Sequence, residues 1–166
     1  EGLWEVRGPR QHFTHSKLFC WVALDRLLQL HREGRLDAIP VEKFAENRDQ
    51  IRREIEQRAW NAGLGCYVQT LGGNTLDATV LQMGFCDFEK PGSRRMRQTF
   101  QRIQERLGAG PGLVYRYEQS FDNGEGAFIM CSFWLADFLA RGGGSLQEAR
   151  RVFSQTLAYA NDVGLF

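Results

Sequence analysis

The chain has 166 residues, of which 43% are hydrophobic and 25% charged, and its net charge is +1. This length suits one domain over residues 1–166, and the balanced charge with acids and bases mixed argues against a nucleic-acid groove. No apolar run reaches the ~20 residues needed to span a bilayer, so we expect no membrane partner.

Two kinds of helix are predicted to alternate along the chain. Thr14–Leu30 is apolar on nearly every side, so this helix is expected to be enclosed by protein. Val41–Trp60 follows Pro40, a residue common at helix starts, and has its apolar side chains on one stripe. A striped helix can face solvent on its other side. We interpret the two as an inner and an outer helix.

The same alternation is predicted twice more. Leu76–Phe88 is apolar, whereas Pro91–Leu107 is one-sided. Glu125–Leu139 is largely apolar, and Ser145–Ala160 begins with a Ser-x-x-Glu capping box before a striped helix. The pattern predicts an all-α fold of three inner/outer hairpins.

The links that lead into the inner helices are long and rich in aromatic and polar residues. They cover residues 1–13, 63–74 and 109–124. In a row of such hairpins these links lie at the same end, which we call the rim. Short strands at Cys66–Gln69 and Leu113–Tyr117 are expected to pair there. The residues expected to converge at the rim are Trp4, Glu5, Arg7, Tyr67, Gln69, Tyr115, Arg116 and Tyr117.

The first link combines an indole, a carboxylate and a guanidinium within four residues. Trp4 offers a flat apolar surface for a sugar ring, and Arg7 offers a fork of donors for hydroxyl groups. An acid such as Glu5, held against an aromatic ring, loses water, and its pKa rises toward the range of a general acid. A surface loop anchored by one Trp is the alternative.

Other candidates have simpler structural explanations. Glu125 is the candidate within this chain for a catalytic base. The helix dipole also stabilises an acid in the first turn of a helix, which would explain Glu125 without catalysis. Asp77 has the same explanation. His12 and His15 lack further ligands at metal-binding spacing, so capping or packing is favoured and no metal is expected.

Five separated motifs resemble bacterial members of glycoside hydrolase family 15, which includes glucoamylases, trehalases and glucodextranases. The resemblance covers nearly the whole chain, in the family's order. Its motifs are Leu3-Trp4-Glu5 with Phe13–Lys17 and Trp21–Arg26, then Leu76–Ala78, Gly112–Tyr117, Glu125–Leu135 and Ala160–Leu165.

The resemblance implies a toroid of six inner and six outer helices, an (α/α)6 toroid, of which this chain holds about half. It implies that Glu5 is the general acid that protonates the glycosidic oxygen of an α-glucoside, and that Arg116 holds glucosyl hydroxyls. Trp4, Arg7, Tyr115, Arg116 and Tyr117 are the candidate substrate-binding residues. No cofactor is implied. Val6 stands where fungal glucoamylases have a second acid.

The inverting mechanism also needs a carboxylate that activates water, roughly 6.5–9.5 Å from the acid. Similar sequences place this base just after the segment that matches Asn161–Leu165, so we expect it beyond residue 166 in a longer protein or absent from a truncated homologue. The alternative is a non-catalytic helical module that binds sugar or forms homo-oligomers through open toroid edges. The cysteines are far apart, and no signal peptide is seen, so reduced thiols and a cytoplasmic location are expected.

Overall fold

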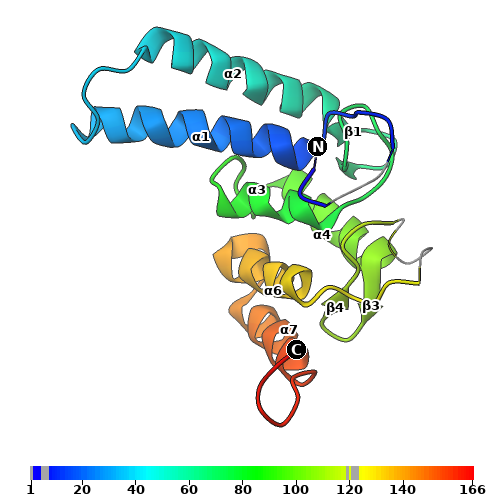
Figure 1. Ribbon diagram of the computed structural model, residues 1–166. Helices are drawn as coiled ribbons and strands as arrows, with labels where there is room; N and C mark the ends of the chain where they lie inside the picture. Colours follow the sequence, from blue (N-terminus) through cyan, green and yellow to red (C-terminus); the bar gives the residue numbers. More distant parts are fainter. Residues whose placement is uncertain (1, 5–7, 119, 121–123) are drawn as a thin grey trace.

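The computed structural model describes residues 2–4, 8–118, 120 and 124–166. Within them the chain forms an all-α fold in which helices follow one another as hairpins (Figure 1). The long pair α1 (Thr14–Arg32) and α2 (Val41–Arg58) lies at one side, and α6 (Ile129–Phe138) with α7 (Leu146–Leu157) lies at the other. The predicted fold class is confirmed.

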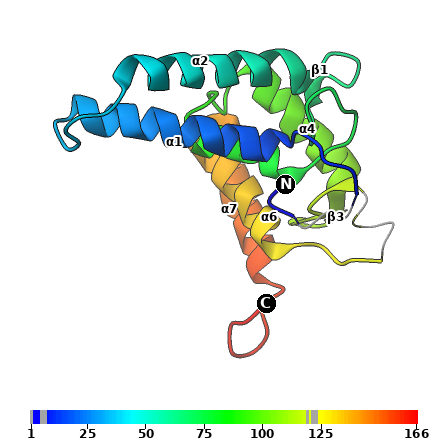
Figure 2. The same cartoon turned by 45° about the horizontal axis from the view of Figure 1, so that its top comes forward.

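The first hairpin agrees with the sequence pattern. Helices α1 and α2 lie side by side in both views (Figures 1 and 2). Helix α2 starts after Pro40 and buries Ile55 on its apolar stripe. It ends at Arg58, two residues before the predicted end, because Trp60 enters the short strand β1 (Trp60–Asn61).

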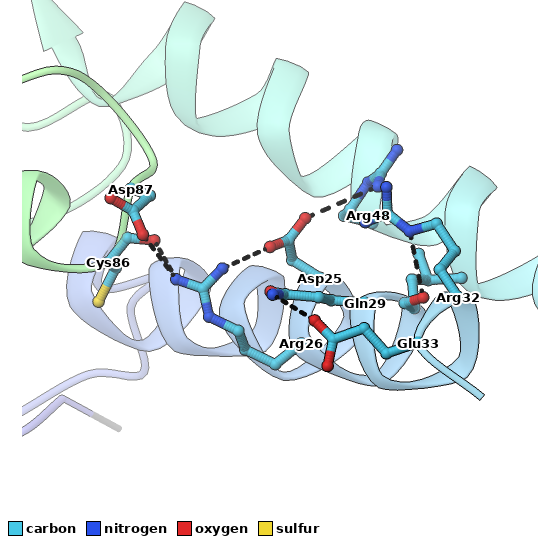
Figure 3. A network of polar contacts seen from close by, with 9 residues as sticks. Asp25, Arg26, Gln29, Arg32, Glu33, Arg48, Cys86 and Asp87 are labelled. Carbon is cyan, nitrogen blue, oxygen red and sulfur yellow. Dashed lines mark hydrogen bonds and ion pairs between the residues drawn. The ribbon is translucent and has the colours of Figure 1, made fainter. Parts of the chain in front are cut away.

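A polar network also ties α1 to its neighbours (Figure 3). Asp25 accepts from Arg26 Nη1 at 2.8 Å and lies 3.7 Å from Nη1 of Arg48 on α2. Arg26 Nη2 donates to the carbonyl of Cys86 at 3.0 Å and to Asp87 at 3.1 Å. Exposed ion pairs contribute little individually, but together these contacts join α1 to α2 and to the turn at Cys86 and Asp87.

The second hairpin has a shorter inner element than predicted. In place of a helix over Leu76–Phe88, the chain forms a 3-10 turn, η1 (Ala78–Leu81), and one α-helical turn, α3 (Gln82–Phe85). The helix starts late because the backbone around Asp77 pairs with the third link, and it ends early because Asp87 has φ +59°. Helix α4 (Arg94–Leu107) is capped by Ser93, which accepts from the Met96 amide.

The third hairpin begins four residues later than predicted. The segment before Ile129 is extended, and the Phe128 amide donates to the Val114 carbonyl at 3.0 Å, so these residues cannot join α6. The π-helical turn η2 (Leu139–Gly143) extends α6 toward α7. The predicted capping box is confirmed: Ser145 and Glu148 satisfy each other's amide groups at the start of α7.

The predicted pairing between the two strand segments is wrong. Strand β2 (Cys66–Tyr67) pairs with β1, and β4 (Leu113–Val114) pairs with β3 (Gly108–Gly110). Each strand finds a partner a few residues away through a tight turn, which costs less chain entropy than a distant pairing. Two isolated bridges, Phe13 with Thr70 and Asp77 with Tyr117, join the links instead.

The expected enclosure of α1 is also wrong for the described residues. Four of its nineteen residues are buried, while Phe19 is 42% and Leu30 is 36% exposed. Its buried face packs on α2 and η1. The largest fully buried side chains come from all three hairpins and from the second link: Tyr67, Phe88, Phe138, Leu18, Ile55, Leu76, Met83, Met96, Ile103, Leu107, Val68 and Val80.

All four cysteines are free thiols, as predicted, and Cys66, Cys86 and Cys131 are buried. Cys20 on α1 is exposed, which differs from the predicted enclosed position. Among the helices that the structure describes, none combines the length and the apolar character that crossing a membrane requires.

His15 provides a test of burial on α1. Its ring lies 4.5 Å from the ring of Phe19, and burial lowers the pKa of His15, although a hydrogen bond with Gln82 acts in the opposite direction. A lowered pKa means that the unfolded state binds the proton more readily, so stability is lost as pH falls below about 6.5. We expect His15→Phe to lose less stability than the wild type between about pH 7.5 and 5.5. Urea unfolding at each pH measures this difference, and parallel curves would contradict it.

Candidate functional site

The three links meet at one rim through backbone hydrogen bonds. The Leu71 amide donates to the His12 carbonyl at 2.9 Å, which joins the second link to the first. The Ala78 amide donates to the Arg116 carbonyl at 2.9 Å, which joins the start of η1 to the third link. The convergence that the hairpin pattern predicts is therefore present for the described parts of all three links.

Trp4 and Asp77 form the buried centre of this rim. The Trp4 indole Nε1 donates to both carboxylate oxygens of Asp77, at 3.1 and 3.0 Å. Asp77 also accepts from the Thr79 amide at 2.8 Å and from Gln69 Nε2 at 3.3 Å. Burial raises the pKa of Asp77, and these hydrogen bonds act against that rise.

Aromatic rings surround the Trp4 indole and form what we call the aromatic wall, made of Trp4, Phe128 and Trp134. Phe128 meets the indole edge-on, with centroids 5.4 Å apart, and Trp134 lies 6.2 Å away at a 35° tilt. Trp4 is 8% exposed, while Phe128 is 38% exposed. The wall thus has a buried base, Trp4, and an edge, Phe128, that solvent reaches.

Arg116 lies against this wall and carries a carboxylate partner. Its guanidinium carbon is 5.4 Å from the Trp4 ring, 5.2 Å from Tyr117 and 5.9 Å from Phe128. Nε and Nη2 donate to the two oxygens of Glu125 at 2.8 and 2.7 Å. These bonds raise the pKa of Arg116. Both side chains are half-buried, so the ion pair has access to solvent.

The other candidates lie in different environments. Tyr117 is buried beside the guanidinium, and Tyr115 is half-buried and donates its amide to the Leu107 carbonyl. Tyr67 is buried in the core, and its hydroxyl donates to Glu89, so it does not join the aromatic wall. Glu5 and Arg7 lie outside the described residues.

Asp77 has a larger role than the sequence predicts. It caps η1 through the Thr79 amide, as the helix-start explanation predicts, but it also binds Trp4. The contact with Trp4 spans 73 residues and leaves no local signal. The available signal was chemical: a buried Trp needs an acceptor for its indole N–H, and Asp77 opens an apolar segment near the rim.

Within the described residues, no group of three or more His, Cys, Asp or Glu side chains is placed to hold a metal ion. The chemistry that this site offers comes from an aromatic surface, a bidentate guanidinium and carboxylates. These are the elements that bind and polarise a hydroxyl-rich ligand.

The fold matches that of known glycosidases. A wild-type glycosidase superposes with a TM-score of 0.83 over 98% of this chain and 43% of its own, at 17% identity. A glycosidase variant in complex with glucose gives a TM-score of 0.81 over 95% of this chain and 41% of its own, at 17% identity. The chain therefore has the all-α hairpin fold of these proteins, and it covers about two fifths of their length.

Sequence comparison gives the family. The profile of "Glycosyl hydrolases family 15" matches residues 1–163, so the chain belongs to glycosyl hydrolase family 15. Trehalase of Mycobacterium tuberculosis is 36% identical over 99% of this chain and 24% of its own length. Trehalase of Thermoplasma volcanium is 27% identical over 99% of this chain and 26% of its own. The chain thus spans about a quarter of the length of these curated relatives.

Proposed function

We propose that this chain is part of the catalytic domain of an inverting glycoside hydrolase that cleaves α-glucosidic bonds, of the trehalase or glucoamylase type. The observation that carries the proposal is the Arg116 guanidinium held 5.4 Å from the Trp4 ring at the rim. Family membership supports hydrolysis of a glycoside. The relatives reported above are trehalases, which makes trehalose the first substrate to test.

In this proposal the sugar lies against the aromatic wall. Trp4 contacts the carbon face of the ring, and Arg116, with Arg7, Tyr115 and Tyr117, binds its hydroxyl groups. Glu5 donates a proton to the glycosidic oxygen as the bond to the anomeric carbon breaks. A water attacks that carbon from the opposite face and gives its proton to a carboxylate base, so glucose leaves with inverted configuration.

Glu125 is the in-chain candidate for the base, but its contacts favour another role. Both of its oxygens accept from Arg116. A carboxylate that orients a guanidinium for a sugar hydroxyl has fewer lone pairs left to take a proton from water. We therefore assign Glu125 to holding Arg116, and we expect the base outside residues 1–166.

The experiment is an assay of glucose release from trehalose, maltose and dextran oligosaccharides. It should use the chain and any longer protein that its coding sequence belongs to. Release of β-glucose, followed by NMR of the anomeric proton, supports an inverting α-glucosidase, and the preferred substrate gives the linkage. Absence of release from every substrate by the longer protein would refute the proposed activity.

Arg116→Lys tests the guanidinium directly. Lysine keeps the charge but not the planar fork, so it cannot reproduce the two parallel bonds to Glu125. We expect kcat/KM for the preferred substrate to fall roughly 10–100-fold, in line with the loss of a charged hydrogen bond. Arg141→Lys is the matched control, because Arg141 pairs with Asp137 on the exposed surface of the third hairpin. Equal effects of the two changes would contradict the assignment.

A cytoplasmic location is part of this proposal. The four free thiols, one of them exposed, support a reducing compartment.

A second candidate is a non-catalytic module that binds sugar or associates with itself. Exposed apolar side chains on α1 and on the last hairpin favour this candidate, since exposed apolar patches often mark protein interaction sites. They include Phe19, Leu30, Leu146, Phe153 and Leu157. Analytical ultracentrifugation of the chain measures this: a strict monomer argues against self-association.

A further inference from the structure

We propose that Asp77 is a positioning residue that holds the Trp4 indole in the orientation in which it serves as a sugar-binding surface. This inference rests on the proposed function. It goes beyond it by assigning a role to a carboxylate that lies behind the aromatic wall and away from the sugar.

The first support is the geometry of the contact. The indole N–H of Trp4 is shared between both oxygens of Asp77, at 3.1 and 3.0 Å. Trp4 and Asp77 are 8% and 2% exposed, so little water competes for this bond. A shared acceptor on one edge of the ring limits its rotation, while Phe128 and Trp134 limit its tilt.

The second support is that Asp77 carries both halves of the site. Its side chain binds Trp4, and its backbone forms an antiparallel bridge with Tyr117. The neighbouring Ala78 amide binds the Arg116 carbonyl at 2.9 Å. One residue thus sets the position of the indole relative to the guanidinium segment.

The third support is that a helix cap alone does not need this carboxylate. A serine hydroxyl can accept from the Thr79 amide as Asp77 does. A buried carboxylate is costly unless its lone pairs are used. Here the donors come from three segments, namely Trp4, Gln69 and Thr79. Their convergence accounts for a charged residue where a smaller cap would suffice.

The experiment is a double-mutant cycle in the active protein with Asp77→Asn and Trp4→Phe. Asparagine turns one acceptor oxygen into an N–H donor, which faces donors at this site. Phenylalanine keeps a flat ring but removes the indole N–H. We expect Asp77→Asn to lower kcat/KM roughly tenfold, and the double variant to lie within about twofold of Trp4→Phe, because contacting residues are coupled. Effects that multiply would overturn the inference.

Two further measurements keep the result interpretable. Ser145→Ala removes a helix cap on α7, far from Trp4, and should leave kcat/KM within about twofold, so loss of a cap alone is controlled. If Asp77→Asn does not fold, Asp77→Ser keeps a cap acceptor and replaces it in the cycle. A loss of kcat/KM by Ser145→Ala equal to that of Asp77→Asn would overturn the inference.

Indole N–H resonances in ¹⁵N NMR separate this inference from the proposed function. The Trp4 signal, identified by its loss in Trp4→Phe, should shift in Asp77→Asn. An unshifted signal overturns the positioning role whatever the activity. A shifted signal in a protein that hydrolyses no glycoside shows that Asp77 holds Trp4 and that the proposed function, with the catalytic part of the inference, is wrong.

Discussion

Replacement of Glu5 by glutamine is expected to lower glucose release from the preferred α-glucoside roughly 10²–10⁴-fold, the range that a general acid contributes. Glutamine keeps the size of the side chain and its hydrogen-bonding ability but has no proton to give to the leaving oxygen. The effect should fall on kcat more than on KM, because protonation is needed in the transition state and not for binding.

The choice of substrate sharpens this test. An aryl α-glucoside with an acidic phenol as leaving group needs less protonation, so Glu5→Gln should lose much less activity on it than on trehalose or maltose. Glu105→Gln is the control, since Glu105 forms an exposed pair with Arg102 on α4. Equal losses on both kinds of substrate would remove Glu5 from the role of acid.

Replacement of Phe138 by alanine is expected to cost about 3–5 kcal/mol of unfolding free energy, the range for deletion of a buried aromatic ring. Phe138 is 2% exposed and stacks on Phe100 with centroids 4.9 Å apart. It also packs directly against Gly143, where an added Cβ would overlap the ring.

Urea unfolding followed by circular dichroism measures this cost. Phe85→Ala is the control from the same residue type, because Phe85 is 56% exposed and lies over Arg141 at the surface. We expect this control to lose less than about 1 kcal/mol. A similar loss for both variants would mean that the interface between α4 and α6 is not part of the cooperative core.

The outer helices could be predicted closely because their stripes and caps are local features. Helix α7 begins at its capping box, and α2 begins after Pro40, as the pattern indicates. The inner segments could not be predicted as well. Their side chains are apolar because they are buried. A short turn such as η1 with α3 buries apolar side chains as well as a long helix does. Periodicity does not separate these cases.

The candidate site could also be predicted in part from the sequence. The hairpin order predicts that the three links meet, and Trp4, Arg116 and Tyr117 do lie together. The partners that fix them, Asp77 for the indole and Glu125 for the guanidinium, depend on three-dimensional packing. Tyr67 was predicted to lie at the rim because it is an aromatic residue in the second link, but its side chain is buried in the core.

The contact between Trp4 and Asp77 joins segments that are far apart in the chain. The indole and its acceptor are 73 residues apart, so forming this contact costs more chain entropy than forming a contact within one hairpin. Transient opening of η1 would release the indole while the long helices persist. Gentle warming should therefore abolish ligand recognition before the helical signal falls.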